Sequence, residues 1–257
     1  MVVISQGQLE DLLSSGQPVE HADLTAIDWA DLGGGVLVAR HCVFSDVVFG
    51  QAELAGARFE DCTFLRCRFA ATNLTDAVFL RCGFFDSESR EGCSFSRADL
   101  DGAAFENCNL ATANFGLASL FDVTFRNCKA AGVDFEGARF GRMMGRKAGP
   151  SRAVFIGCML DMANFSQASL ADCILTECSL RQANMWQAVL SSADMRGSDL
   201  SEAVMTGAIL DHADLRDALL FGIDVTRLAG FEGIKVSADQ LPDIVRAIGI
   251  KVFPAMR

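Results

Sequence analysis

Large apolar residues recur at every fifth position along most of this chain. They stand at residues 44 to 84 in one register and at residues 95 to 225 in a second, and we call them centre residues. A small residue stands two positions before most centres, as in ADL at 98–100 and ADM at 193–195. A period of five fits neither the 3.6-residue repeat of an α-helix nor the two-residue repeat of a β-strand. The chain therefore has to fold as a stack of short, equivalent units.

The repeat A-(D/N)-(L/F)-x-x resembles that of the pentapeptide-repeat proteins and covers roughly Ala22 to Arg227. The resemblance implies an all-β solenoid, a right-handed quadrilateral β-helix with four pentapeptides to a coil, two loop interruptions and a C-terminal helix. Centre and small residues would point inward, because a narrow square tube has room for one large and one small side chain per side. We expect an N-terminal cap at 1–21, the β-helix at 22–227, and a C-terminal helix and dimerisation segment at 228–257.

All ten cysteines stand two residues before a centre position, where they replace the small alanine. They are Cys42, Cys62, Cys67, Cys82, Cys93, Cys108, Cys128, Cys158, Cys173 and Cys178. Cysteines twenty residues apart would stack on adjacent coils, where an oxidising compartment would threaten them. Since the CxxC spacing of zinc sites is also absent, the sequence predicts reduced, buried thiols rather than disulfides or a metal site.

The N-terminal segment MVVISQGQLED has no basic region and no apolar run of signal-peptide length. No window of the sequence approaches the roughly 18 apolar residues of a membrane span. We therefore expect a cytoplasmic protein without a membrane partner.

Two loops interrupt the five-residue repeat. Across loop A (85–92) the centres Phe84 and Phe95 are eleven positions apart, and across loop B (141–152) the centres Phe140 and Phe155 are fifteen positions apart. Loop A has a net charge of −2, whereas loop B carries four basic residues and no acid. Loops of this kind can be tolerated insertions without a function of their own.

Loop A also carries a resemblance to the Qnr quinolone-resistance family. The segment FFDSESREGCSFSRADL at 84–100 contains every fixed position of the family's F-x-D-x-E-S-x-x-G-C-x-F-S-R-A-x-L pattern. Loop B stands where that family has its second loop, with a more basic sequence, and GFEGIKVSADQLPDIVRAIGIKVF at 230–253 is similar to the family's closing segment. The resemblance implies an acidic, partly DNA-mimicking dimeric rod that binds the type II topoisomerases DNA gyrase and topoisomerase IV. Such a rod would protect these enzymes from quinolones or similar poisons.

On this basis we assign partner binding to residues of both loops. In loop A they are Phe85, Asp86, Ser87, Glu88, Ser89 and Arg90. In loop B they are Arg142, Met143, Met144, Gly145, Arg146 and Lys147. Loop A would reach the enzyme directly or would brace loop B.

Both ends of the repeat carry helix signals. Gln6 to Ser14 predicts a short N-terminal helix, and SADQLPDIVRAIG at 237–249 offers capping-box spacing followed by a glycine stop. Apolar residues beside the second helix predict a two-fold dimer interface, with simple capping of the solenoid as the alternative. The interface residues are Leu219, Phe221, Leu241, Val245 and Ile248.

The net charge of −11 favours a partner with a basic surface and argues against direct binding of nucleic acid, although moderate acidity can also serve solubility alone. The three histidines are far apart along the predicted rod, and no nucleophile recurs beside a base at usable spacing. We therefore expect no enzyme, no catalytic residue, no cofactor and no metal. The alternative function is a non-catalytic pentapeptide-repeat scaffold that binds another protein partner.

Overall fold

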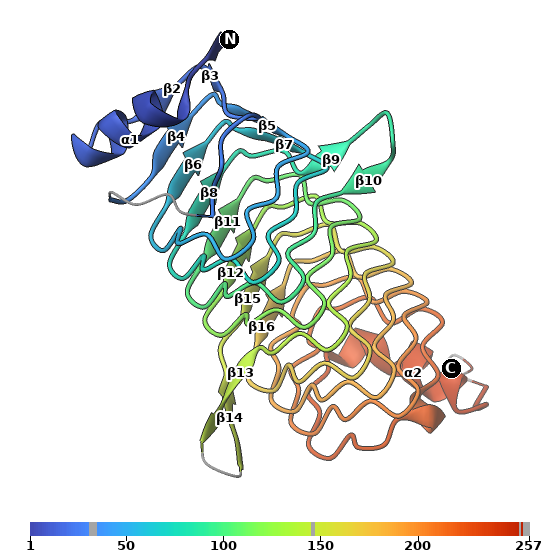
Figure 1. Cartoon of the computed structure of the whole chain (residues 1–257). Coiled ribbons are helices and arrows are strands. Elements are labelled where there is room, and N and C mark those ends of the chain that lie inside the picture. The colour runs from blue at the N-terminus through green and yellow to red at the C-terminus, as the bar shows by residue number, and fades with distance from the viewer. Residues whose placement is uncertain (31–34, 145–146, 252, 254–257) are drawn as a thin grey trace.

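The computed structural model describes residues 1–30, 35–144, 147–251 and 253, with the side chains of 143–150 left out of the description. The chain winds into a long right-handed quadrilateral β-helix with a helix at each end (Figure 1). The strands are β1 (Val2–Val3), β2 (Val19–Glu20), β3 (Ala22–Asp23), β4 (Val38–Arg40), β5 (Val43–Ser45), β6 (Arg58–Glu60), β7 (Thr63–Leu65), β8 (Val78–Leu80), β9 (Phe85–Asp86), β10 (Glu91–Gly92), β11 (Ala104–Glu106), β12 (Thr124–Arg126), β13 (Gly141–Met144), β14 (Lys147–Ser151), β15 (Val154–Ile156) and β16 (Ile174–Thr176). The helices are α1 (Gln6–Ser14), the 3-10 turns η1 (Val225–Arg227) and η2 (Ala238–Gln240), and α2 (Leu241–Ala247).

One side of the rod is an eight-stranded parallel sheet in the order β16-β15-β12-β11-β8-β6-β4-β2. A second side begins with the four-stranded sheet β1-β3-β5-β7, and isolated parallel bridges continue the pairing elsewhere. Paired residues are usually twenty apart, as for Phe59 and Phe79. The separation is 26 between Phe79 and Phe105, across loop A, and 30 between Phe125 and Phe155, across loop B. Loop A thus adds six residues to its coil and loop B adds ten, and neither shifts the inward positions.

The corners of the rod are built by residues with a left-handed backbone two positions after each centre. At one corner Ala98 N donates to Phe95 O at 3.0 Å, and the residue before Ala98, Arg97, has φ 62°. A side chain in this conformation costs roughly 1 kcal/mol. The corner amides also donate to the next coil, as Arg97 N does to Gly116 O at 3.1 Å, so each corner is held by its neighbour.

Phenylalanine rings stack along the inside of the N-terminal part of the rod. The Phe64 ring lies 4.5 Å from Phe44 and 4.8 Å from Phe84, nearly parallel to both. Across loop A, Phe69 and Phe95 still stack at 4.5 Å. The inner ladder is therefore continuous past the interruption. Beyond residue 165 the buried centre residues are leucine and methionine.

The cysteines form part of this core. All ten are buried, which confirms their predicted inward position, and all ten are free in this structure. Most donate to a carbonyl of the preceding coil, as Cys82 Sγ does to Phe59 O at 3.4 Å. Burial raises the pKa of Cys173 to about 12, which keeps that thiol protonated near neutral pH.

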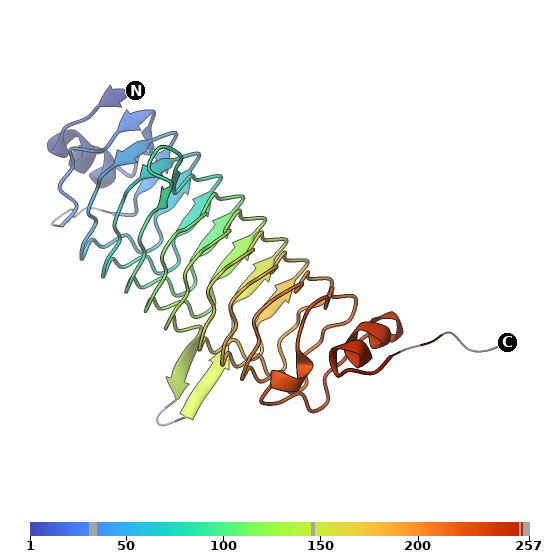
Figure 2. The same cartoon turned by 90° about the vertical axis from the view of Figure 1, so that its right-hand side faces the viewer.

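The N-terminal end is closed by α1 on the first coil (Figure 2). Ser5 and Gln8 form a capping box at its start, and Leu9 and Leu13 are buried in the core. Gln6 ties the helix to the coil, because its side chain donates to Asp28 O and accepts from Asp28 N, both at 3.1 Å. Parallel pairing already begins at β1, so coil geometry starts before residue 22.

The C-terminal end closes differently. The last coil contains one extra residue, because Ile209 pairs with Gly230 and Asp214 with Lys235 at a spacing of 21. Ser237 forms the predicted capping box with Gln240, but this box starts η2. The α-helix itself, α2, is only seven residues long. The Gln240 side chain donates to Leu215 O at 2.8 Å and to Ala218 O at 2.6 Å, which fastens this segment to the rod.

The stacked rings give a direct stability prediction. Phe64 is fully buried, so Phe64→Ala removes a ring between two others and leaves a cavity. We expect this variant to lose about 3–5 kcal/mol of unfolding free energy. Phe64→Leu keeps most of the volume and should lose about 1 kcal/mol. Urea unfolding followed by circular dichroism measures both values, and equal losses in the two variants would contradict the stacking account.

Candidate partner-binding surface

Loop A is a short antiparallel hairpin that leaves one corner of the rod. Strand β9 pairs with β10, with Glu91 opposite Asp86 and Gly92 opposite Phe85. The turn between them, residues 87–90, is exposed. Its tip therefore presents a serine-rich surface with one carboxylate, Glu88, and one guanidinium, Arg90.

Asp86 is buried and is not the partner-contact residue that the sequence predicted. It is only 5% exposed, and its carboxylate accepts from Arg66 and, at 2.9 Å, from the backbone N–H of Glu88. Arg66 also donates to both carboxylate oxygens of Asp46 at 2.8 Å, so three coils are joined by one guanidinium. The Glu88 amide, aided by Arg66, holds the pKa of Asp86 below its ordinary value. This support for the hairpin is present above about pH 4 and is lost as the pH falls through that lowered pKa.

Gly92 is required where the hairpin returns to the rod. A Cβ at this position would lie 2.5 Å from Ala113 N and 2.6 Å from Ala111 O on the next coil. Backbone atoms cannot move aside as the end of a flexible side chain can. The glycine of the loop A pattern therefore reflects close backbone approach between coils.

Gly92→Ala tests this approach, with Gly83→Ala as its matched control. A Cβ at Gly83, in the same coil, would meet no atom within 4 Å. We expect Gly92→Ala to destabilise the fold by about 1–3 kcal/mol through overpacking, with Gly83→Ala close to neutral. Thermal unfolding compares the two, and an unchanged melting temperature for Gly92→Ala would show that the coils can separate at this point.

Loop B is a longer hairpin of β13 and β14. Met144 pairs with Lys147 and Gly141 with Ser151, with a register shift near Gly141. Gly145 and Arg146, both predicted contact residues, lie outside the described residues, as do the side chains of Met143, Met144 and Lys147.

Both strands of loop B are fixed at the foot of the hairpin. On β13, Arg142 Nη2 lies 3.1 Å from Asp101 Oδ2, and the guanidinium carbon lies 4.4 Å from the centre of the Phe121 ring. On β14, Ser151 is buried and donates to Ser169 O at 3.1 Å. The Arg142 side chain is engaged by the rod and orients the hairpin, but it is still 63% exposed, so its predicted partner contact stays a prediction. Sequence reasoning missed Asp101 and Phe121, because these residues lie 41 and 21 positions before Arg142 and meet it only in the folded rod.

The two hairpins leave the rod at different places. In Figure 1 the β9–β10 hairpin projects from one flank near the N-terminal end, and the β13–β14 hairpin projects from the opposite flank farther along. Figure 2 shows the same separation along the rod. The idea that loop A braces loop B is therefore wrong, and each hairpin is braced by the coils beneath it.

In the acidic C-terminal half of the rod, part of the negative charge is neutralised on the side that continues the eight-stranded sheet beyond β16. Arg196 Nη2 lies 2.6 Å from Asp194, and Arg216 Nη2 lies 2.7 Å from Asp214. These arginines hold the pKa values of both carboxyls below the ordinary range. Exposed acids without such close partners stand at corners, for example Asp172 and Glu177. The acidic surface is thus concentrated along edges of the rod.

The predicted dimer residues gather at the C-terminal end. Phe221 is 68% exposed and Leu219 60%, while Leu241 and Ile248 are about half exposed and Val245 is partly buried.

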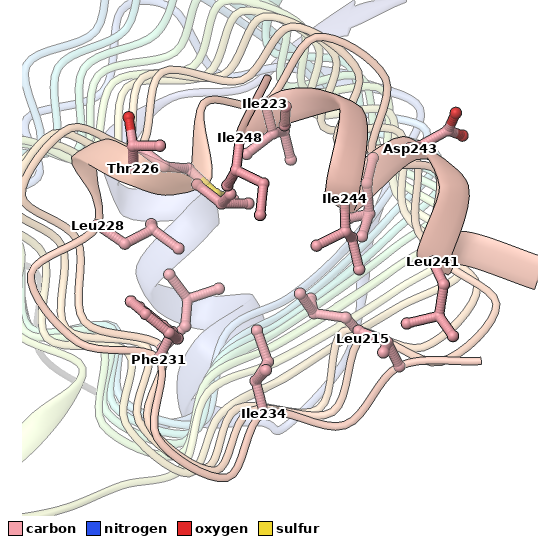
Figure 3. A pocket seen from close by; sticks show the side chains of 16 residues that line it. Leu215, Ile223, Thr226, Leu228, Phe231, Ile234, Leu241, Asp243, Ile244 and Ile248 are labelled. Carbon is pink, nitrogen blue, oxygen red and sulfur yellow. The ribbon is translucent and has the colours of Figure 1, made fainter. Parts of the chain in front are cut away.

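Beside these residues an apolar cavity of about 540 Å³ opens between the last coil and α2. Leu215, Leu228, Phe231 and Ile244 are among the side chains that line it, and the Asp243 carboxylate points away from it (Figure 3). The core of the solenoid is therefore only partly closed at this end.

Among the described residues, no helix has the length and apolar character needed to cross a membrane, and no three acidic, histidine or cysteine side chains are grouped to hold a metal ion.

Comparison with known proteins identifies the family to which this chain belongs. Eight copies of the family model described as pentapeptide repeats match residues 42–79, 91–116, 151–187 and 187–220, about half of the chain. The chain belongs to the pentapeptide-repeat family. No curated protein sequence matches it.

Solved structures narrow the resemblance of this pentapeptide-repeat protein. Full-length QnrB1, a plasmid-mediated fluoroquinolone resistance protein, is 31% identical, with a TM-score of 0.75 over 81% of this chain and 97% of QnrB1. A trypsin-treated QnrB1 variant matches with the same identity and TM-score over 82% and 99% of the two chains. About a fifth of the present chain lies outside these matches.

Proposed function

We propose that this pentapeptide-repeat protein binds type II topoisomerases, DNA gyrase or topoisomerase IV, and protects them from quinolones or similar poisons. The similarity to QnrB1 over nearly its whole length carries this proposal. The protein acts by binding and has no catalytic role. The presence of both hairpins favours this function over a scaffold for another partner. An uninterrupted rod would be sufficient for such a scaffold.

The charge of the rod supplies orientation. Between residues 155 and 225 the sequence has ten acids and three bases, a net charge of −7. Topoisomerases must present basic surfaces to bind DNA. An acidic rod is attracted to such a surface, and its unpaired edge carboxylates set the direction of approach. The carboxylates along the edges of the rod therefore account for its partial imitation of DNA.

The hairpins supply the specific contact. Loop A offers Ser87, Glu88, Ser89 and Arg90 at an exposed tip, and Phe85 is partly buried at its base. Loop B offers the predicted residues beyond its fixed foot at Arg142. Because both feet are tied to the rod, the base of each hairpin is positioned without the entropy loss of ordering a free segment.

A deletion tests the role of loop B. Coils joined across it are 30 residues apart, so removal of ten residues, Arg142 to Ser151, restores the ordinary spacing of 20. We expect the intact protein to rescue gyrase supercoiling in the presence of ciprofloxacin and the deletion variant to rescue it at least tenfold less effectively, a difference of about 1.4 kcal/mol.

Circular dichroism and thermal unfolding of the deletion variant serve as the folding control. Full rescue by the folded variant would remove loop B from the mechanism. If the intact protein neither binds nor rescues gyrase or topoisomerase IV with any poison, the scaffold function becomes the better proposal.

We also propose that two chains associate through the exposed apolar C-terminal surface, which would cover the partly open core. Phe221→Asp places a charge in the middle of this surface. We expect the mass in sedimentation to fall from twice 27.6 kDa to 27.6 kDa. Val48→Asp is the control, since Val48 is 54% exposed near the other end of the rod, where it pairs with Arg68. A Phe221→Asp variant that remains dimeric would place the interface elsewhere.

A further inference from the structure

The foot of loop B is surrounded by exposed arginines. Arg139 precedes β13 by two residues, and Arg152 directly follows β14, with its N–H directed at Phe140 O at 3.4 Å. Arg126 ends β12 and pairs in the sheet with Ile156 of β15, the next strand after the hairpin. All three are exposed, and within the described part of the chain none has a carboxylate within ion-pair distance. They are therefore available to an external anion.

The acids near this foot do not cancel the positive charge. Asp101 is occupied, because it accepts from Arg142, from Ser119 Oγ at 2.7 Å and from Phe121 N at 3.1 Å. By their place in the repeat, Asp122 and Asp172 occupy the same corner on the coils to either side, and both are exposed, while Glu106 lies opposite Arg126 on the preceding coil without an ion pair to it. Against these, the segment 141–152 holds four basic residues and no acid. The foot of loop B is thus a basic zone on a protein whose net charge is −11.

The shape of loop B favours one class of anion. Strands β13 and β14 form a two-stranded antiparallel ribbon that stands away from the rod (Figure 1). The major groove of B-DNA, about 12 Å wide, admits such a ribbon. Arginine guanidinium groups match phosphate oxygens in paired hydrogen bonds and are the usual means of positioning a protein on a duplex. A flat acidic protein surface would require no projecting ribbon.

We propose that the β13–β14 ribbon and Arg126, Arg139 and Arg152 contact the sugar–phosphate backbone of duplex DNA while that DNA is held by the topoisomerase. This inference rests on the proposed function, because the net charge of the protein opposes binding to free DNA at physiological salt. The acidic edges meet basic protein surface, and the basic foot of loop B meets the DNA beside it. The protein then recognises the enzyme with DNA bound more strongly than the enzyme alone.

Photo-crosslinking tests the contact directly. The photoreactive residue p-benzoylphenylalanine replaces Arg152 in the full chain, and gyrase is supplied with a fluorescein-labelled duplex that carries a gyrase cleavage site. We expect a labelled adduct between the chain and the DNA. The same residue at Arg58, exposed on β6 of the same sheet but several coils away, is the control and should give no DNA adduct.

Salt dependence gives a second, independent measurement. The variant Arg126→Gln/Arg139→Gln/Arg152→Gln removes three phosphate contacts. We expect the logarithmic salt slope of its binding to the gyrase–DNA complex to fall by about 3, at roughly 0.9 per phosphate contact. Arg58→Gln/Arg68→Gln/Arg97→Gln makes the same charge change at three other exposed arginines and should leave the slope unchanged.

The outcomes separate this inference from the proposed function. Binding to gyrase with adducts to its protein subunits only, or with displacement of the DNA, overturns the DNA contact and leaves topoisomerase protection standing. Equal salt slopes for the two triple variants overturn it as well. If the intact chain does not bind gyrase, the proposed function fails. In that case the binding of the labelled duplex alone is measured at low salt. Binding that is lost in Arg126→Gln/Arg139→Gln/Arg152→Gln supports the DNA-contacting surface, and the absence of binding refutes it.

Discussion

The exact stacking of one coil on the next is the constraint on which the rest of this structure depends. A ring such as Phe64 lies 4.5 and 4.8 Å from its neighbours above and below, which is close to the spacing of hydrogen-bonded strands. Every inward side chain must therefore meet its counterpart on the next coil, and every backbone amide its carbonyl. A long insertion within the rod is accommodated where it leaves the rod between two inward positions. Loop A and loop B satisfy this rule with six and ten extra residues, so the rod fixes where each hairpin projects.

The five-residue repeat made the fold and the core predictable because inward position follows directly from residue number. The buried state of the ten cysteines followed from this repeat, and the helix at Gln6–Ser14 followed from separate helix signals before it. The support of the hairpins could not be predicted in this way. Asp86 looked like an exposed loop residue, and its burial depends on Arg66 reaching it from the coil below. Likewise, the seat of Arg142 on Asp101 and Phe121 requires the coils to be aligned in space.

The distribution of charge gives the rod two different surfaces. On the strand side of the C-terminal half, Asp194 and Asp214 are paired with arginines and contribute little net charge. Within the described residues, the edges retain carboxylates and the foot of loop B retains guanidinium groups that have no close ion-pair partner. A partner with both basic protein surface and DNA phosphates is complementary to this arrangement. A topoisomerase engaged with DNA has both.

The central claim is that a rigid rod presents two hairpins to its partner. Hydrogen–deuterium exchange of the full-length protein with and without gyrase tests it most directly. The coil amides already donate to the next coil, so the account predicts little change along residues 95–140 and marked protection of residues 85–92 and 141–152 when the enzyme is added. Protection confined to the coils, with both hairpins unchanged in the bound state, would contradict it.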